Sequence, residues 1–145
     1  MKRILIINGP NLNLLHLRDK KIYGEISIDK IIEECREIAK QVNLEIDYKQ
    51  SNSESEIVDF IQDAIKKYQG LIINAAAYTH TSVAIRDALE IFHGKKIELH
   101  ISNIFKREDF RHNSFLSEVV DGIICGLGVE GYIIALLAMH KIIVK

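Results

Sequence analysis

The sequence has few of the features that secreted, membrane and nucleic-acid-binding proteins depend on. It has only two cysteines, Cys35 and Cys125, and both lie in apolar periodic segments, so we expect no disulfide framework and a reduced, cytoplasmic setting. The formal net charge of −1 provides no attraction toward nucleic acid or an anionic membrane. The first apolar run, residues 4–7, is too short for a signal peptide, and His140 and Lys141 interrupt the apolar C-terminal stretch, which is too short to span a bilayer.

Motifs of metal and nucleotide chemistry are also scarce. The six histidines have no close metal-ligand spacing and the two cysteines are far apart, so we expect no metal site. The sequence contains neither a Walker A loop nor a G-x-S-x-G elbow. Residues 126–131 fit G-x-G-x-x-G, but no further strand follows to complete a nucleotide-binding unit. We interpret this segment as a tight turn with close helix–sheet packing, and we expect no cofactor.

The chain does carry a regular alternation of strand and helix patterns. Its 145 residues, 48% hydrophobic and 27% charged, suit a single domain over residues 1–145 with a real core. Short apolar runs predict strands, and three- and four-residue apolar spacing predicts helices between them. The predicted strands are 4–7, 44–48, 71–73, 97–101 and 123–125, and the predicted helices are 28–42, 53–65, 82–92 and 129–142.

This β-α order predicts one parallel sheet with helices on both faces. Five strands favour a flavodoxin-like doubly wound α/β fold, which places the second strand at an edge. Residues 44–48 alternate between apolar and polar, as a half-exposed edge strand would. Residues 4–7, 71–73 and 123–125 are continuous apolar runs, which is typical of strands buried on both faces.

The longest polar connection, residues 9–24, follows the first strand. It is longer than a strand-to-helix connection needs to be, and it leaves the carboxyl edge of the sheet, where open α/β sheets bind ligands. We therefore interpret it as a lid. The lid carries Arg18 and Tyr23, and a guanidinium close to a tyrosine favours the phenolate. Such a pair could abstract a proton next to a carbonyl group.

Other polar residues also follow strands at the same edge. Alternation places Glu98 and His100 on one face of a strand, where a carboxylate can orient and charge an imidazole. A half-buried polar pair in an ordinary strand explains these two residues equally well. The loop before Ser82 could hold an anion at a helix N-terminus, although a plain helix cap is the more common explanation. A solvated basic turn likewise accounts for Lys106 and Arg107. Arg111 is the stronger candidate for the site, because it leaves the same edge of the sheet.

Six stretches of the chain closely resemble type II 3-dehydroquinate dehydratase, in the order and spacing of that family. They are residues 8–15, 18–24, 78–88, 98–103, 107–112 and 122–132. The resemblance implies a flavodoxin-like fold and a homo-oligomer, a dodecamer built as a tetramer of trimers. It also implies dehydration of 3-dehydroquinate to 3-dehydroshikimate in the shikimate pathway, with no cofactor.

The resemblance further implies a role for particular residues. Tyr23 resembles the catalytic base, Arg18 its activating cation and His100 the general acid, with Glu98 orienting His100 and Asn11 positioning a water molecule. The implied substrate-binding residues are Asn74, His80, Ile101, Ser102 and Arg111, together with Asp87, which would reach the site of a neighbouring subunit.

The chain departs from the family pattern in two places. Many relatives have glycine at His16 and proline at Lys20, both in the lid. Many also have glycine or proline in the loop of residues 74–77, where this chain has three alanines. Because alanine tolerates a positive φ poorly, we expect this loop to avoid such a conformation or to have shifted.

One function of another class stays open at this point. A flavodoxin-like nucleotide-binding or regulatory module could use residues 126–131, because fold alone does not decide function. The Arg18–Tyr23 and Glu98–His100 pairs favour the enzyme.

Overall fold

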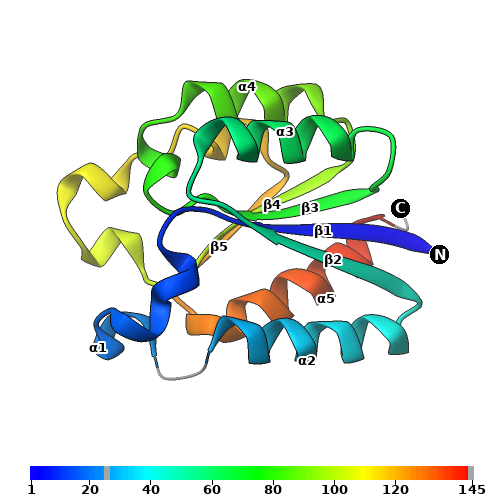
Figure 1. The fold of residues 1–145 in the computed structure, drawn as a ribbon, viewed down its shortest axis with the longest axis horizontal. Helices are drawn as coiled ribbons and strands as arrows, with labels where there is room; N and C mark the ends of the chain where they lie inside the picture. The colour runs from blue at the N-terminus through cyan, green and yellow to red at the C-terminus, as the bar shows by residue number, and fades with distance from the viewer. Residues whose placement is uncertain (25–26, 144–145) are drawn as a thin grey trace.

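The protein folds around one five-stranded parallel sheet (Figure 1). The computed structural model describes residues 1–24 and 27–143. The strands are β1 (Lys2–Asn8), β2 (Leu44–Gln50), β3 (Gly70–Asn74), β4 (Lys95–His100) and β5 (Gly122–Cys125). Their order, β2-β1-β3-β4-β5, and their parallel pairing confirm the flavodoxin-like fold and place β2 at an edge, as expected.

Four helices cover the two faces of the sheet. In Figure 1, α3 (Glu54–Ala64) and α4 (Val83–Ile91) lie on one side of the strands, and α2 (Ile28–Gln41) and α5 (Gly131–Ile143) lie on the other. Serine caps begin three of these helices: the hydroxyls of Ser27, Ser53 and Ser82 each accept a hydrogen bond from a backbone N–H of the first turn. The Ser53 bond comes from Glu56, as the capping-box pattern predicts.

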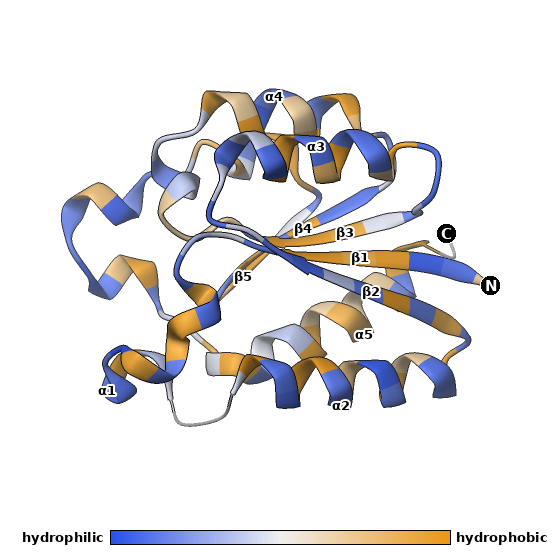
Figure 2. Cartoon of the chain, in the orientation of Figure 1, coloured by the Kyte–Doolittle hydropathy of each residue, from blue (hydrophilic) through white to orange (hydrophobic). Residues whose placement is uncertain are grey.

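The core is divided into two layers by the alternation of side chains along the strands. On β1, Ile4 and Ile6 pack in the layer under α2 and α5, whereas Leu5 and Ile7 pack in the layer under α3 and α4. All four side chains are fully buried. Figure 2 shows hydrophobic residues along β1 and β3, and both hydrophobic and hydrophilic residues along the helices that flank them.

The prediction that the fifth strand is buried on both faces is wrong for the single chain. β5 is the second edge strand, and the side chain of Ile123 is 50% exposed. The apolar run correctly predicts a strand, but it does not say which neighbours the strand has.

The G-x-G-x-x-G segment that follows β5 is a tight turn, as expected: Gly126 and Gly128 have φ values of 88° and 66°. A Cβ atom at Gly131 would lie 2.8 Å from Leu99 Cδ1, so the helix–sheet packing is close.

The predicted lid, residues 9–24, is largely helical. A 3₁₀ segment covers Leu12–Leu17, and the short helix α1 (Lys20–Tyr23) follows it, capped by the Asp19 carboxylate. These turns place Arg18 and Tyr23 at the carboxyl edge of the sheet. Within the described residues, no helix has both the length and the apolar character needed to cross a membrane.

The alanine loop after β3 contradicts one expectation. Ala76 has a φ of 52°, so alanine here adopts the left-handed conformation, and the first of the two alternatives, that the loop avoids it, is wrong. Ala76 opens a 3₁₀ segment (Ala76–His80), and its N–H donates to Asn74 Oδ1 at 3.2 Å. This local hydrogen bond and the packing of the loop hold the strained backbone in place.

Candidate active site

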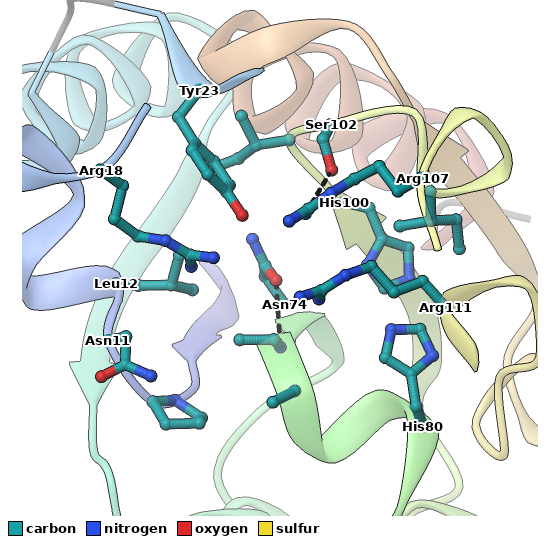
Figure 3. Close-up of a pocket in the computed structure, with 15 residues that line it drawn as sticks. Asn11, Leu12, Arg18, Tyr23, Asn74, His80, His100, Ser102, Arg107 and Arg111 are labelled. Carbon is teal, nitrogen blue, oxygen red and sulfur yellow. Dashed lines mark hydrogen bonds between the residues drawn. The ribbon is translucent and has the colours of Figure 1, made fainter. Parts of the chain in front are cut away.

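One cavity lies at the carboxyl edge of the sheet, and it brings together most of the predicted site (Figure 3). It is lined by nine of the eleven predicted residues: Asn11, Arg18, Tyr23, Asn74, His80, His100, Ile101, Ser102 and Arg111. Of the other two, Glu98 lies behind His100, and Asp87 lies on the exposed side of α4 beside Arg86, away from this cavity. The strand ends and the lid therefore converge as the parallel topology predicts.

Arg18 and Tyr23 form one wall of the cavity. The Arg18 guanidinium carbon lies 4.2 Å from the centre of the Tyr23 ring. Figure 3 shows the Tyr23 hydroxyl directed into the cavity, with Arg107 and Arg111 on the opposite side. The Tyr23 side chain is 6% exposed, so nearby charges act on it with little screening by water. The Tyr23 ring therefore has a guanidinium group on each of two sides, from Arg18 and Arg107.

His100 lines the opposite side of the cavity, with Glu98 behind it. His100 Nε2 lies 2.5 Å from Glu98 Oε2, and both side chains are buried. Burial raises the pKa of Glu98, but the hydrogen bond and charge of His100, with hydrogen bonds from Ser117 and Ser114, outweigh it, so the pKa lies below its ordinary value. Glu98 is therefore a carboxylate that accepts from His100 Nε2. Nδ1 is then the His100 ring nitrogen that remains to exchange a proton with a ligand in the cavity.

His80 stacks beside His100, with 6.3 Å between the ring centres. Its Nδ1 lies 2.8 Å from the carbonyl oxygen of Asn113, which can only accept, so Nδ1 carries the proton. Burial lowers the pKa of His80 and the charges of His100 and Arg111 lower it further, against the hydrogen bond to Asn113, which raises it. His80 is therefore neutral at neutral pH, and Nε2 is its acceptor atom.

Asn74 is held at the floor of the cavity by a buried polar network. Its Nδ2 donates to the Tyr132 hydroxyl at 3.1 Å, and that hydroxyl donates to Asn8 Oδ1 at 2.6 Å. Asn8 in turn donates to the Tyr48 hydroxyl at 3.2 Å. Complete burial raises the pKa of Tyr132, so it stays a neutral hydrogen-bonding group. The network ties the ends of β1, β2 and β3 to α5, and among the described residues it leaves one Asn74 N–H without a partner.

Comparison with known proteins agrees with this arrangement. Residues 2–140 match the family described as dehydroquinase class II. The chain is 49% identical, over 96% of its length and 97% of the relative's, to the 3-dehydroquinate dehydratase of Endomicrobium trichonymphae. It is 52% identical to that of Tolumonas auensis, over 94% of this chain and 90% of that one. The crystal structure of type II dehydroquinase from Butyrivibrio crossotus superimposes with a TM-score of 0.91 at 47% identity, covering 95% of this chain and 97% of the other.

The chain belongs to the class II dehydroquinase family.

Membership of the dehydroquinase family confirms the resemblance drawn from the sequence motifs. It also weighs against the alternative of a nucleotide-binding module. Residues 126–131 do not line the cavity that holds the predicted site. Among the described residues, no group of three or more histidine, cysteine, aspartate or glutamate side chains could hold a metal ion.

One residue that lines the cavity was not predicted from the sequence. Arg107, which we interpreted as part of a solvated basic turn, lines the cavity with its side chain only 14% exposed. Its guanidinium lies 5.4 Å from the centre of the Tyr23 ring and donates to Ser102 Oγ at 3.2 Å. The reasoning that favoured Arg111, departure from the same sheet edge, applies equally to Arg107 and could have found it.

Proposed function

We propose that this protein dehydrates 3-dehydroquinate to 3-dehydroshikimate in the shikimate pathway, with Tyr23 as base and His100 as acid. The observation that carries the proposal is that the Arg18–Tyr23 pair and the Glu98–His100 pair face one cavity from opposite sides. Elimination of water next to a ketone needs these two functions, a base and an acid, on either side of the substrate. Relatives named 3-dehydroquinate dehydratase over nearly the full chain support the substrate.

The proposed reaction moves two protons. The Tyr23 phenolate takes a proton from the carbon next to the ketone, and the electron pair of that C–H bond forms an enolate. The enolate then re-forms the ketone and expels the hydroxyl group one carbon further along as a carbon–carbon double bond forms. His100 gives its proton to the departing hydroxyl, which leaves as water, and transfer of the Tyr23 proton back to His100 completes the cycle.

The other predicted residues serve these steps in the proposal. Arg18 stabilises the phenolate and the enolate, because a cation close to developing negative charge lowers the barrier. Asn11 positions a water molecule at the enolate oxygen. Asn74, His80, Ile101, Ser102 and Arg111, which all line the cavity, bind the hydroxyl and carboxylate groups of the substrate.

The direct test is incubation of the purified protein with 3-dehydroquinate. The product contains a conjugated enone, so absorbance in the ultraviolet should rise with time and in proportion to the amount of protein. A His100→Ala variant is the control, and it should lose this rise. A wild-type protein that gives no enone would contradict the proposed function.

We also propose that the protein works as a closed homo-oligomer, a dodecamer built as a tetramer of trimers. Asp87 is exposed on α4 and lies outside its own cavity, as a residue that serves a neighbouring subunit would. The exposed apolar side chains of Ile123, Ile134 and Leu137 suit contacts between subunits. Light scattering in the assay buffer should therefore give a mass several times that of the chain, whereas a fully active monomer would contradict this proposal.

A further inference from the structure

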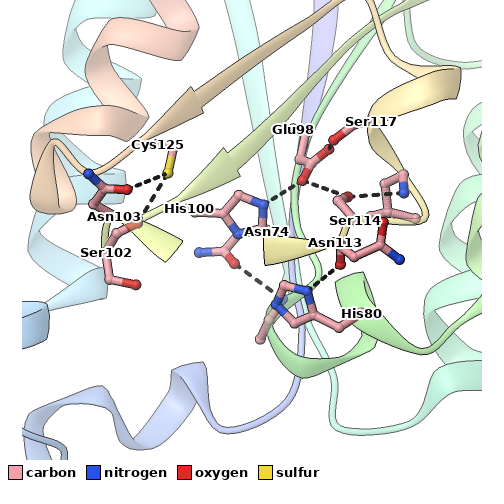
Figure 4. A network of polar contacts seen from close by, with 12 residues as sticks. Asn74, His80, Glu98, His100, Ser102, Asn103, Asn113, Ser114, Ser117 and Cys125 are labelled. Atoms are coloured by element: carbon pink, nitrogen blue, oxygen red, sulfur yellow. Dashed lines mark hydrogen bonds and ion pairs between the residues drawn. The ribbon is translucent and has the colours of Figure 1, made fainter. Parts of the chain in front are cut away.

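Two serines outside the predicted site converge on Glu98. They belong to the segment of residues 113–117, which we call the brace and which lies beside Glu98 and His80 (Figure 4). The Ser114 hydroxyl lies 2.9 Å from Glu98 Oε2, and the Ser117 hydroxyl lies 2.8 Å from Glu98 Oε1. Together with His100, three side chains therefore contact the two oxygens of one carboxyl group.

The directions of these hydrogen bonds favour an ionised Glu98. The Leu116 N–H donates to Ser114 Oγ at 3.1 Å, so the Ser114 hydroxyl proton is free to point at Glu98. A carboxylate can accept from Ser114, Ser117 and His100 at once, because it has about four lone-pair sites. A protonated carboxyl group would turn its own O–H toward one of these groups, which would then have to accept instead of donate.

The burial of Glu98 explains why so many donors are needed. Its side chain is 1% exposed, and a carboxylate so far from water is costly unless hydrogen bonds and an opposite charge replace its hydration. His100 supplies the charge only while it is protonated. The serines are neutral donors, so they stabilise the carboxylate both before and after His100 has given up its proton.

The brace also holds the second imidazole of the site. The carbonyl oxygen of Asn113 accepts from His80 Nδ1, and the Phe115 N–H donates to the carbonyl oxygen of Thr79 at 2.9 Å. One short segment therefore orients both His80 and, through Glu98, His100. Its side-chain hydroxyls both point to the carboxylate, so a role in the turn alone does not account for them.

We propose that Ser114 and Ser117 are positioning residues, which keep Glu98 ionised and aimed at His100 so that His100 presents its proton to the substrate. This inference rests on the proposed function, in which His100 is the general acid. The serines touch neither the cavity nor the reacting atoms and act only through Glu98. The titratable group that acts on Glu98 is His100 on its own strand, and the charges of Glu98, His100 and Arg111 in turn act on His80.

Ser117→Ala is the sharpest variant for a test. Within the described residues, the Ser117 hydroxyl bonds to Glu98 alone, whereas Ser114 Oγ also accepts from the backbone of its own turn. Ser117→Thr keeps the hydroxyl and serves as the conservative variant. Ser55→Ala is the matched control, because it removes an exposed serine hydroxyl whose contact is with Ser53, and neither serine lines the cavity or contacts Glu98.

The measurement is an infrared pH titration of the protein without substrate. The carbonyl stretch of a protonated carboxyl group that is missing in Glu98→Gln belongs to Glu98. In Ser117→Ala we expect the midpoint of this band to move up by about one pH unit, because a hydrogen bond to the charged form is lost. Ser117→Thr and Ser55→Ala should keep the wild-type midpoint.

The pH dependence of kcat gives a second readout. Loss of the donor should weaken turnover on the acid side of the profile, where Glu98 gains a proton earlier, and leave the alkaline side nearly unchanged. An unchanged band in Ser117→Ala, or an equal fall of kcat at every pH with an unchanged band, would overturn the proposal. Should Ser117→Ala not fold, Ser114→Ala is expected to move the band in the same direction, and an unchanged band there would count equally against it.

The two proposals fail in different ways. A wild-type protein that does not turn over 3-dehydroquinate would contradict the proposed function, while the infrared titration still reports on the serines because it needs no substrate. Normal wild-type turnover with a band that is unmoved in Ser117→Ala would contradict the role of the brace alone.

Discussion

At the scale of single residues, Tyr23 has the most direct consequence for activity. Its hydroxyl is the atom proposed to take the substrate proton, and Tyr23→Phe removes only that oxygen from a buried ring. We predict that kcat falls by ~10²–10⁴-fold while KM changes little, as expected when a positioned base is lost. Steady-state kinetics would measure this.

Tyr68→Phe is the matched control for Tyr23. Tyr68 lies just before β3, at the amino end of the sheet, and does not line the cavity at the carboxyl end. Its hydroxyl, which the substitution removes, donates to Asp47 at 2.6 Å. It should keep its kcat. A Tyr23→Phe variant with near-normal kcat would show that the base is another group.

Ala76 gives a prediction on stability at the same scale. Its φ of 52° costs an L-amino acid about 1–2 kcal/mol, whereas glycine adopts this conformation freely. Ala76→Gly should therefore raise the free energy of unfolding by up to about 1 kcal/mol, since the greater freedom of glycine in the unfolded chain offsets part of the relief. Urea denaturation measures it. The control Ala84→Gly, at an exposed position in the first turn of α4, should instead lower stability, by at most about 1 kcal/mol.

At the scale of elements, the serine that caps α4 is buried and the serine that caps α3 is exposed. We therefore expect loss of the α4 cap to lower the free energy of unfolding more. The Ser82 hydroxyl accepts from the Ile85 N–H at 2.9 Å, and Ser82 is 1% exposed. Ser82→Ala would leave this N–H without a partner and without water, so we predict a loss of about 1–2 kcal/mol in the free energy of unfolding. Ser53→Ala at the exposed start of α3, where the cap bond is 3.3 Å, should cost less. Equal losses in thermal or urea unfolding would contradict this.

At the scale of the whole molecule, the placement of the lysines bears on the mechanism. Among the described residues, no lysine lines the cavity. Lys49, which follows the alternating part of β2, has its Nζ 5.0 Å from the Phe60 ring. We therefore predict that no lysine forms a Schiff base with substrate, a step that needs an amine desolvated beside the carbonyl group.

Borohydride reduction tests this prediction. Treatment of the protein together with 3-dehydroquinate should leave activity intact and add no mass, and treatment without substrate is the control. A substrate-dependent adduct on a lysine, found by mass spectrometry with a matching loss of activity, would replace the phenolate mechanism while the overall reaction stands.

The architecture and much of the candidate site could be predicted from the sequence because both follow from short-range patterns. Apolar periodicity distinguishes strands from helices, and β-α alternation implies a parallel sheet. Since all strands of such a sheet end at one edge, residues as distant as Tyr23, Asn74 and His100 could be assigned to one place. The family motifs added roles to residues that the pattern had already brought together.

Only the tertiary structure decided how the connections pack. Ser114 and Ser117 reach Glu98, and Ala76 takes a left-handed backbone, yet neither arrangement follows from a local pattern. Loops have no period that says which way a side chain points, and their conformation is set by the buried groups that need partners. The exposed side of β5 has the same cause, since an apolar run predicts a strand but its burial depends on which neighbours lie beside it.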